Sequence, residues 1–310
     1  TVAPASPQQG RIWFLEQLDP GLPTYNTPSA HRLRGALDVV ALERALNAMV
    51  ARQASLRTVI VEQDGAPLQI VAPELTVQLG EIHDLCALPP ADREVELMKR
   101  LQARSAEVFD LGELPLFKLG LYRLAKDDHV LFFMPHHIIW DGWSFDLIYD
   151  EMAALYPAFA EGRTADLAPL PVTYGDYAAW QRRWLETPDL QRQLGYWRER
   201  LTPLPSPLSL PADHPRPKRM TGGGDTYWFS NPPDWFARLH QFALQQNATP
   251  CMVLLSAFAA LLWRQSGQTD LVIGTPVRGR PTVDLERVMG FFVNALPLRI
   301  RPDPAQSFAS

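Results

Sequence analysis

The residues best suited to chemistry lie in one short stretch, where His136 and His137 are followed after three residues by Asp141 and Gly142. Histidine has an unperturbed pKa near neutrality, so either ring could accept or donate a proton. A buried carboxylate needs a cationic partner, which leads us to expect an arginine beside Asp141. Glycine lets a backbone N–H approach a substrate oxygen closely. The pattern therefore indicates proton transfer or oxyanion stabilisation.

Two other chemistries fit part of this stretch. Paired histidines occur in zinc sites, but no third ligand is evident, and His136 and His137 lack the i, i+4 spacing of a helical metalloprotease motif. The chain contains no GxSxG sequence, which disfavours a serine hydrolase. A purely structural histidine is the ordinary alternative for either ring. We predict that the site holds no metal.

The stretch is framed by a predicted strand at 129–134 and a predicted helix at 145–159. Residues displayed where a strand gives way to a loop are well placed for catalysis. The dipeptide Asp64-Gly65 predicts a hairpin turn, and Lys126-Asp127-Asp128 a second one. Other helices are predicted at 39–52, 91–108, 174–200, 235–246 and 250–263, and other strands at 56–61, 67–71, 116–124, 225–229, 268–274 and 291–299. This order of elements predicts a mixed α/β fold.

Composition limits the class of protein. The chain has 310 residues, 46% of them hydrophobic, which is enough for two lobes. A net charge of -5 disfavours nucleic-acid binding, and the lone Cys86 and Cys251 disfavour a disulfide framework. The first nine residues lack the features of a signal peptide, and the apolar run at 252–263 is too short to span a membrane. We expect a cytoplasmic protein without membrane or nucleic-acid partners.

Proline marks the connectors. One cluster lies at 167–172 and another at 202–218, which is followed by glycines at 222–224. The first cluster predicts a lobe boundary, with an N-terminal lobe at 1–170 and a partial C-terminal lobe at 171–310. The second predicts a long surface loop.

At residues 136–144, HHIIWDGWS resembles the HHxxxDG signature of condensation domains of nonribosomal peptide synthetases. Five further stretches resemble motifs of that family in the expected order: SPQQGRIWFL at 6–15 (SxAQxRLWxL), RQASLRT at 52–58 (RHExLRTxF), YGDYAAW at 174–180 (YxDYAxW), IGTPVRGR at 273–280 (IGTPVANR) and GFFVN at 290–294 (GxFVN). Pro7 and Gln8 depart from the first of these motifs, and Gln53 and Ala54 replace the His and Glu of the second. A motif close to RDxSRNP is absent from the chain. Family members run further, so we expect an incomplete second lobe.

The resemblance implies two lobes similar to chloramphenicol acetyltransferase, arranged in a V around a tunnel. Upstream donor and downstream acceptor carrier proteins (thiolation domains) would deliver thioesters on phosphopantetheine, beside an adjacent adenylation domain. The acceptor amine would attack the donor thioester carbonyl to form an amide. No directly bound cofactor is implied.

The same resemblance assigns roles to residues. His137 would position or deprotonate the amine, and the N–H of Gly142 would face the developing oxyanion. His136 belongs to the catalytic motif but is expected to be structural, as is Asp141. The candidate partners of Asp141 are Arg57, Arg278 and Arg280. Ser144 is expected to cap the following helix, and packing roles are expected for Tyr174, Asp176 and Trp180.

Alternatives remain open within and beyond this family. A heterocyclisation domain would carry DxxxxD, and an epimerisation domain usually departs at the glycine, so the intact motif favours amide formation. The opening residues resemble members that take donors ending in an L-residue, with a polyketide-type donor as the alternative. A catalytically inactive module that recruits partners would share the fold. A stand-alone acyltransferase acting on a soluble alcohol or amine would share the chemistry.

Overall fold

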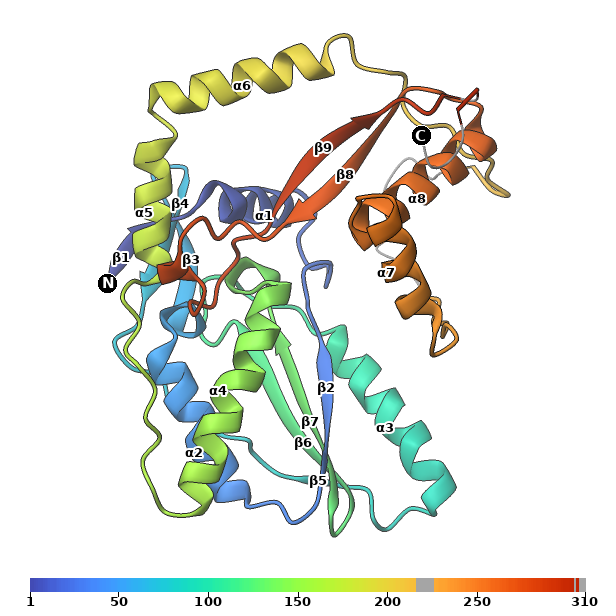
Figure 1. Ribbon diagram of the computed structural model, residues 1–310. Helices are drawn as coiled ribbons and strands as arrows, with labels where there is room; N and C mark the ends of the chain where they lie inside the picture. The colour runs from blue at the N-terminus through green and yellow to red at the C-terminus, as the bar shows by residue number, and fades with distance from the viewer. Residues whose placement is uncertain (216–225, 304, 307–310) are drawn as a thin grey trace. The chain divides into compact units, whose positions relative to one another are not determined.

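The computed structural model describes residues 1–215, 226–303 and 305–306 (Figure 1). Its contacts group the chain into two units, one of Thr1–Thr187 with Arg278–Asn294 and one of Pro188–Val277 with Ala295–Ser310. Residues 171–187 and 278–294 thus pack with the N-terminal part of the chain. The units therefore differ from the predicted division at 170/171, which stays a prediction about the lobes. The predicted surface loop at 202–218 has no helix or strand over 202–215, and its remaining residues and the glycines at 222–224 lie outside the described residues.

The larger sheet of the first unit has the strand order β2-β7-β6-β5, antiparallel except between β5 and β6. Its strands are β2 (Ser29–Arg34), β5 (His83–Asp84), β6 (Phe117–Ala125) and β7 (Asp128–Pro135). Strands β6 and β7 form the predicted hairpin. All of β7 after Asp128 is buried, so both faces of this strand are covered.

Helices cover both faces of this sheet (Figure 1). The helices of the first unit are α1 (Pro7–Leu18), α2 (Val39–Arg52), α3 (Pro90–Ser105), α4 (Gly142–Ala160) and α5 (Tyr174–Trp184). Helix α3 packs against Phe132 and Met134 of β7. Helices α2 and α4 share a core with Leu131 and Phe133. Because successive strand residues point to opposite faces, β7 contributes side chains to the hydrophobic cores on both faces of the sheet.

A smaller sheet of the first unit has the order β1-β4-β3. Its strands are β1 (Val2–Pro4), β3 (Thr58–Gln63) and β4 (Ala66–Val71). The predicted hairpin turn joins β3 and β4, with φ of 53° at Asp64 and 76° at Gly65. Both residues adopt the left-handed backbone that a tight turn of this type requires.

Helix boundaries follow local chemistry. Helix α2 has the predicted bounds, and Asp38 caps its first turn by accepting a hydrogen bond from the N–H of Ala41. The helix predicted at 174–200 is wrong as one element, because it breaks into α5 and α6 (Pro188–Leu201). Pro188 starts the second helix, since its ring lacks the N–H that a continuous helix would need.

The second unit contains α6, α7 (Trp235–Gln245), α8 (Pro250–Ser266) and a sheet of β8 (Leu271–Val277) and β9 (Asn294–Ile300). Thr249 caps α8 by accepting from the N–H of Met252, and Pro250 occupies the first turn, as the sequence predicts. The strand predicted at 225–229 is wrong for 226–229, which have no regular structure, and Asp225 lies outside the described residues.

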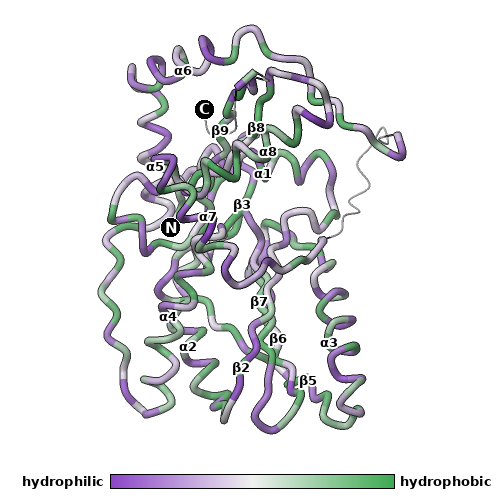
Figure 2. Tube along the Cα trace, turned by 45° about the vertical axis from the view of Figure 1, so that its right-hand side comes forward, coloured by the Kyte–Doolittle hydropathy of each residue, from purple (hydrophilic) through white to green (hydrophobic). Residues whose placement is uncertain are grey.

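The helices of the second unit differ in hydropathy. Helix α6 has no buried residue, and hydrophilic residues dominate it in Figure 2. Among the described residues, no single helix is long and apolar enough to cross a membrane. Helices α7 and α8 meet that criterion only as a pair, bent by 94°.

Candidate active site

The histidine pair lies on the loop between β7 and α4, which includes the short 3-10 helix η2 (His137–Ile139). Backbone bonds fix this loop on both sides: the N–H of His136 donates to the carbonyl of Leu116, and that of His137 to the carbonyl of Tyr25, each at 2.8 Å. From α1, the side-chain amide of Gln9 donates to the carbonyl of Ile138 at 3.1 Å. The loop is therefore held by three other parts of the first unit.

The hydrogen bonds of His137 assign its tautomer. Its Nδ1 lies 2.6 Å from the carbonyl oxygen of Trp140, which can only accept, so Nδ1 carries the proton. In the neutral ring, Nε2 then has a free lone pair. No partner for Nε2 occurs in the described part of the chain. The rings of His137 and Phe291 are in a T-shaped contact with centroids 4.8 Å apart. His137 is thus oriented, half-buried and able to accept a proton at Nε2.

His136 has the opposite tautomer. Its Nδ1 accepts from the N–H of Ile138 at 3.2 Å, which leaves the proton on Nε2, facing a carboxylate oxygen of Glu16 at 3.4 Å. The residue is buried, with Tyr25 and Phe109 as ring neighbours. Both nitrogens are occupied, so this ring stabilises the loop and has no free base.

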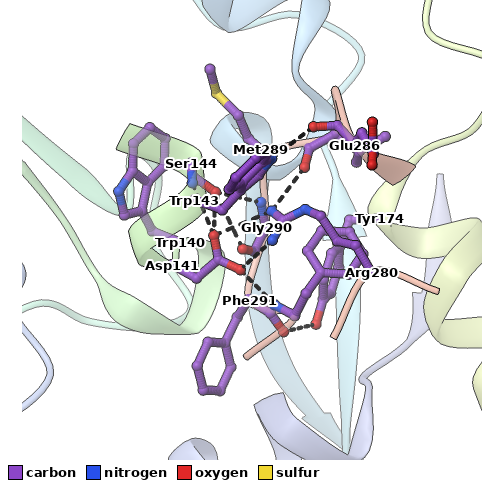
Figure 3. Close-up of polar contacts among 12 residues, drawn as sticks. Trp140, Asp141, Trp143, Ser144, Tyr174, Arg280, Glu286, Met289, Gly290 and Phe291 are labelled. Carbon is purple, nitrogen blue, oxygen red and sulfur yellow. Dashed lines mark hydrogen bonds and ion pairs between the residues drawn. The ribbon is translucent and has the colours of Figure 1, made fainter. Parts of the chain in front are cut away.

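Asp141 is the centre of a buried network (Figure 3). Its carboxylate receives two parallel bonds from Arg280, at 2.8 Å and 3.2 Å, and the two side chains are 1% and 0% exposed. Ser144 donates to it through N–H and Oγ, and the N–H of Phe292 completes the set. Arg280 also donates to the carbonyl of Val288 and lies over the ring of Phe292. This network fastens residues 278–294 to the start of α4.

The other two candidate arginines have different partners. Arg57 donates to four backbone carbonyls, at residues 50, 51, 72 and 73. It therefore joins the end of α2 to the segment after β4. Arg278 lies over the indole of Trp143 at 4.3 Å and pairs with Glu286 at 3.1 Å. The arginine that pairs with Asp141 is Arg280.

Gly142 is the first residue of α4, and its side of the helix is open. A Cβ built at this position would meet no atom within 4 Å in the described structure. The N–H groups of a helix N-terminus carry partial positive charge and favour an anion. The expectation that Ser144 caps α4 is wrong, because Asp141 is the N-cap and Ser144 donates to it.

Several residues that support the site lie in the stretches YGDYAAW and GFFVN, but those patterns do not reveal the contacts that the residues make. Phe291 was expected in a strand, yet it precedes β9 and packs on His137. Tyr174 does pack, against Phe292, but its hydroxyl also donates to the carbonyl of Phe291 at 2.6 Å. An added Cβ at Gly290 would lie 2.2 Å from the ring of Tyr174, so this close approach requires glycine. Such contacts between distant segments are invisible to sequence periodicity.

The other residues of the YGDYAAW stretch have local roles. Thr173 is the N-cap of α5, and the carboxylate of Asp176 accepts from the N–H of Thr173 to complete a capping box. Trp180 packs near Tyr177 and Trp184. In the described residues, no three His, Cys, Asp or Glu side chains are grouped as metal ligands.

The family model for the condensation domain matches residues 1–310. The chain belongs to the condensation domain family. Among curated relatives, the domain is 42% identical over 296 residues to a linear gramicidin synthase of Brevibacillus parabrevis. It is also 42% identical over 305 residues to phosphinothricin tripeptide synthetase PhsC of Streptomyces viridochromogenes. These alignments cover 96% and 98% of this condensation domain.

A solved structure supports the fold. The first condensation domain of the calcium-dependent antibiotic synthetase, in complex with a substrate analogue, matches with a TM-score of 0.85 and 27% identity. The match covers 100% of this condensation domain and 71% of that chain. The condensation domain spans only 6% and 28% of the lengths of the two curated relatives. The α/β fold of this family, similar to chloramphenicol acetyltransferase, is thereby confirmed.

Proposed function

We propose that this condensation domain forms an amide bond between two carrier-bound substrates. The amine of an acceptor aminoacyl thioester attacks the carbonyl carbon of a donor acyl or peptidyl thioester. The carbon–sulfur bond breaks, the donor carrier's thiol is released, and the amine loses a proton. The observation that carries the proposal is the orientation of His137, whose Nδ1 is occupied by Trp140 while Nε2 is free.

His137 is the catalytic residue of this proposal. Its Nε2 accepts the proton of the attacking amine, or a hydrogen bond from it as the zwitterionic intermediate forms. The N–H of Gly142 faces the oxyanion at the positive end of α4. His136 keeps the loop in place, and the pair of Asp141 and Arg280 holds the start of α4.

The partners follow from the same reaction. Both substrates are carried on the phosphopantetheine of thiolation domains, upstream for the donor and downstream for the acceptor, with an adenylation domain nearby. The relatives named as synthetases support this arrangement. The domain itself binds no cofactor in this proposal. The intact motif from His136 to Gly142 favours amide formation over heterocyclisation or epimerisation.

The test is intact-mass detection of amide transfer between two loaded carrier proteins. His137→Asn is the sharpest variant, because its amide nitrogen can still donate to Trp140 while Nε2 is lost. We expect its rate to fall about 10²-fold or more. His240→Ala, at an exposed position of α7, is the matched control and should retain the rate.

Other outcomes contradict the proposal in different ways. An unchanged rate in His137→Asn would remove His137 from the reaction. No transfer by the folded parent would favour a partner-recruiting module. Transfer to a soluble amine without the acceptor carrier would identify a stand-alone acyltransferase.

A further inference from the structure

Gln53 occupies a buried junction of the first unit. It follows the last residue of α2 and is fully buried, at 0% exposure. Its Nε2 donates to a carboxylate oxygen of Glu151 at 2.6 Å and to the carbonyl of Arg287 at 3.1 Å. Its Oε1 accepts from the N–H of Met289 at 3.0 Å. These partners fix the amide orientation, because a carbonyl can only accept and an N–H can only donate.

The segment held by Gln53 leads directly to the candidate base. Two residues after Met289, the ring of Phe291 makes a T-shaped contact with the ring of His137. Between them, the N–H of Gly290 donates to Ser144 Oγ at 3.2 Å. The position of Phe291 therefore depends on bonds made at 287, 289 and 290, in addition to the bond from Tyr174 to its own carbonyl.

Charged groups surround the junction. Glu151 of α4 is 6% exposed, and burial, opposed by Gln53 and Arg52, raises the pKa of its carboxyl. Arg52 of α2 donates to the same carboxylate oxygen at 3.0 Å, and the charge of Arg287 also acts on it. Glu151 titrates, but the bond from Met289 goes to the amide oxygen of Gln53, which gains and loses no proton in the working range.

We propose that Gln53 is a positioning residue that holds residues 287–291 against α2 and so fixes Phe291 beside His137, through a link that does not titrate. The proposal rests on the function proposed for His137. The position carries histidine in the motif RHExLRTxF, which this chain resembles at 52–58 except at Gln53 and Ala54. Glutamine supplies two donor hydrogens and an acceptor at once, whereas a neutral imidazole supplies one of each.

The substitution Gln53→His should make the hydrogen bond from Met289 depend on pH, so that the bond is present at high pH and lost at low pH. A neutral imidazole can accept from Met289 with one nitrogen and donate to Glu151 with the other. A protonated ring has only donors, so one of its N–H groups would face the N–H of Met289 and that bond would be lost.

The experiment is a pH profile of amide transfer from about pH 6 to 9 for the parent and three variants. Gln53→His lacks the bond to Arg287 at every pH, so it should be modestly slower than the parent at high pH. It should lose a further factor of about five to ten in rate as the pH falls, the effect of one buried hydrogen bond. Gln53→Asn, whose shorter amide cannot reach all partners, should be slower at every pH with no new ionisation. Gln102→His, at an exposed position of α3, is the matched control and should follow the parent.

A second readout requires no activity. In protein labelled with ¹⁵N-histidine, the ring signals of His137, assigned through His137→Asn, should shift in Gln53→His with the same midpoint as the rate. If the parent forms no amide, this shift still supports the positioning role while the proposed function fails. The proposal is overturned if folded Gln53→His follows the parent profile, if Gln53→Asn keeps the parental rate, or if the His137 signals do not respond. Should Gln53→His unfold, Gln53→Asn still tests the positioning role, because its rate should be lower and its His137 ring signals shifted at every pH.

Discussion

Replacing Arg280 by methionine should strongly destabilise the first unit. In the described structure the carboxylate of Asp141 accepts five hydrogen bonds, and Arg280 donates two of them. Methionine fills much of the volume of the arginine side chain but leaves the carboxylate of Asp141, which is 1% exposed, without a cation beside it. Breaking one side of a buried ion pair costs about 3–5 kcal/mol, because the remaining charge is uncompensated. We expect the free energy of unfolding to fall by that amount.

The assay is urea unfolding followed by tryptophan fluorescence, for Arg280→Met, Asp141→Asn and the double variant. Asp141→Asn removes the charge, so the double variant should lose about 2 kcal/mol less than the sum of the single losses. The matched control is Arg278→Met in the same segment, whose side chain is 42% exposed in its pair with Glu286. It should change the stability by less than about 1 kcal/mol. A loss below about 1 kcal/mol in Arg280→Met, or strictly additive losses, would refute the reasoning.

Three further predictions concern separate features. Thr249→Ala removes the side-chain oxygen that caps α8 by accepting a hydrogen bond from the N–H of Met252. Thermal unfolding should show a loss of about 1 kcal/mol in stability. An unchanged melting temperature would contradict this. The hydrogen bond from Arg299 lowers the pKa of Asp270 from 3.8 to about 2 in the folded protein. The ionised Asp270 therefore stabilises the fold fully above pH 3.8, and this contribution is lost as the pH falls toward 2. Asp270→Asn should therefore flatten the acid side of a plot of melting temperature against pH, and an identical acid limb would count against the ion pair. Gly142→Ala should change the free energy of unfolding by no more than about 0.5 kcal/mol, because the added Cβ would contact no other atom. The same Cβ would occupy the open space beside the helix N-terminus and should slow amide transfer. Full transfer activity would show that the substrates do not use this space.

Local signals were sufficient for much of the fold. The apolar spacing of α2 and the Asp64-Gly65 turn predict these elements because the forces that set them act within a few residues. Helix α1 could not be predicted from apolar spacing, because its buried residues include Gln8 and Gln9 and form no apolar stripe. These glutamines are buried because tertiary partners satisfy them, as the bond from Gln9 to Ile138 shows.

The candidate site was predicted by residue type but not by arrangement. The HHxxxDG pattern locates His137, while the choice of Arg280 over two other arginines depends on a contact across 139 positions. The opposite tautomers of His136 and His137 follow from backbone carbonyl and N–H groups, which every sequence contains. Gln53 carries no catalytic signal, because its role depends on three partners in distant segments.

The pairing of Asp141 with Arg280 also sets an order of events during synthesis. At about 5–20 residues per second, the ribosome adds Arg280 roughly 7–30 s after Asp141. During that interval the nascent chain already contains β7 and α4, but the carboxylate at the start of α4 has no cation to join it. Residues 188–277, which belong to the other unit, emerge first. The N-terminal fold is therefore completed late on the ribosome, and a pause in translation before residue 280 would prolong its exposure to chaperones and proteases.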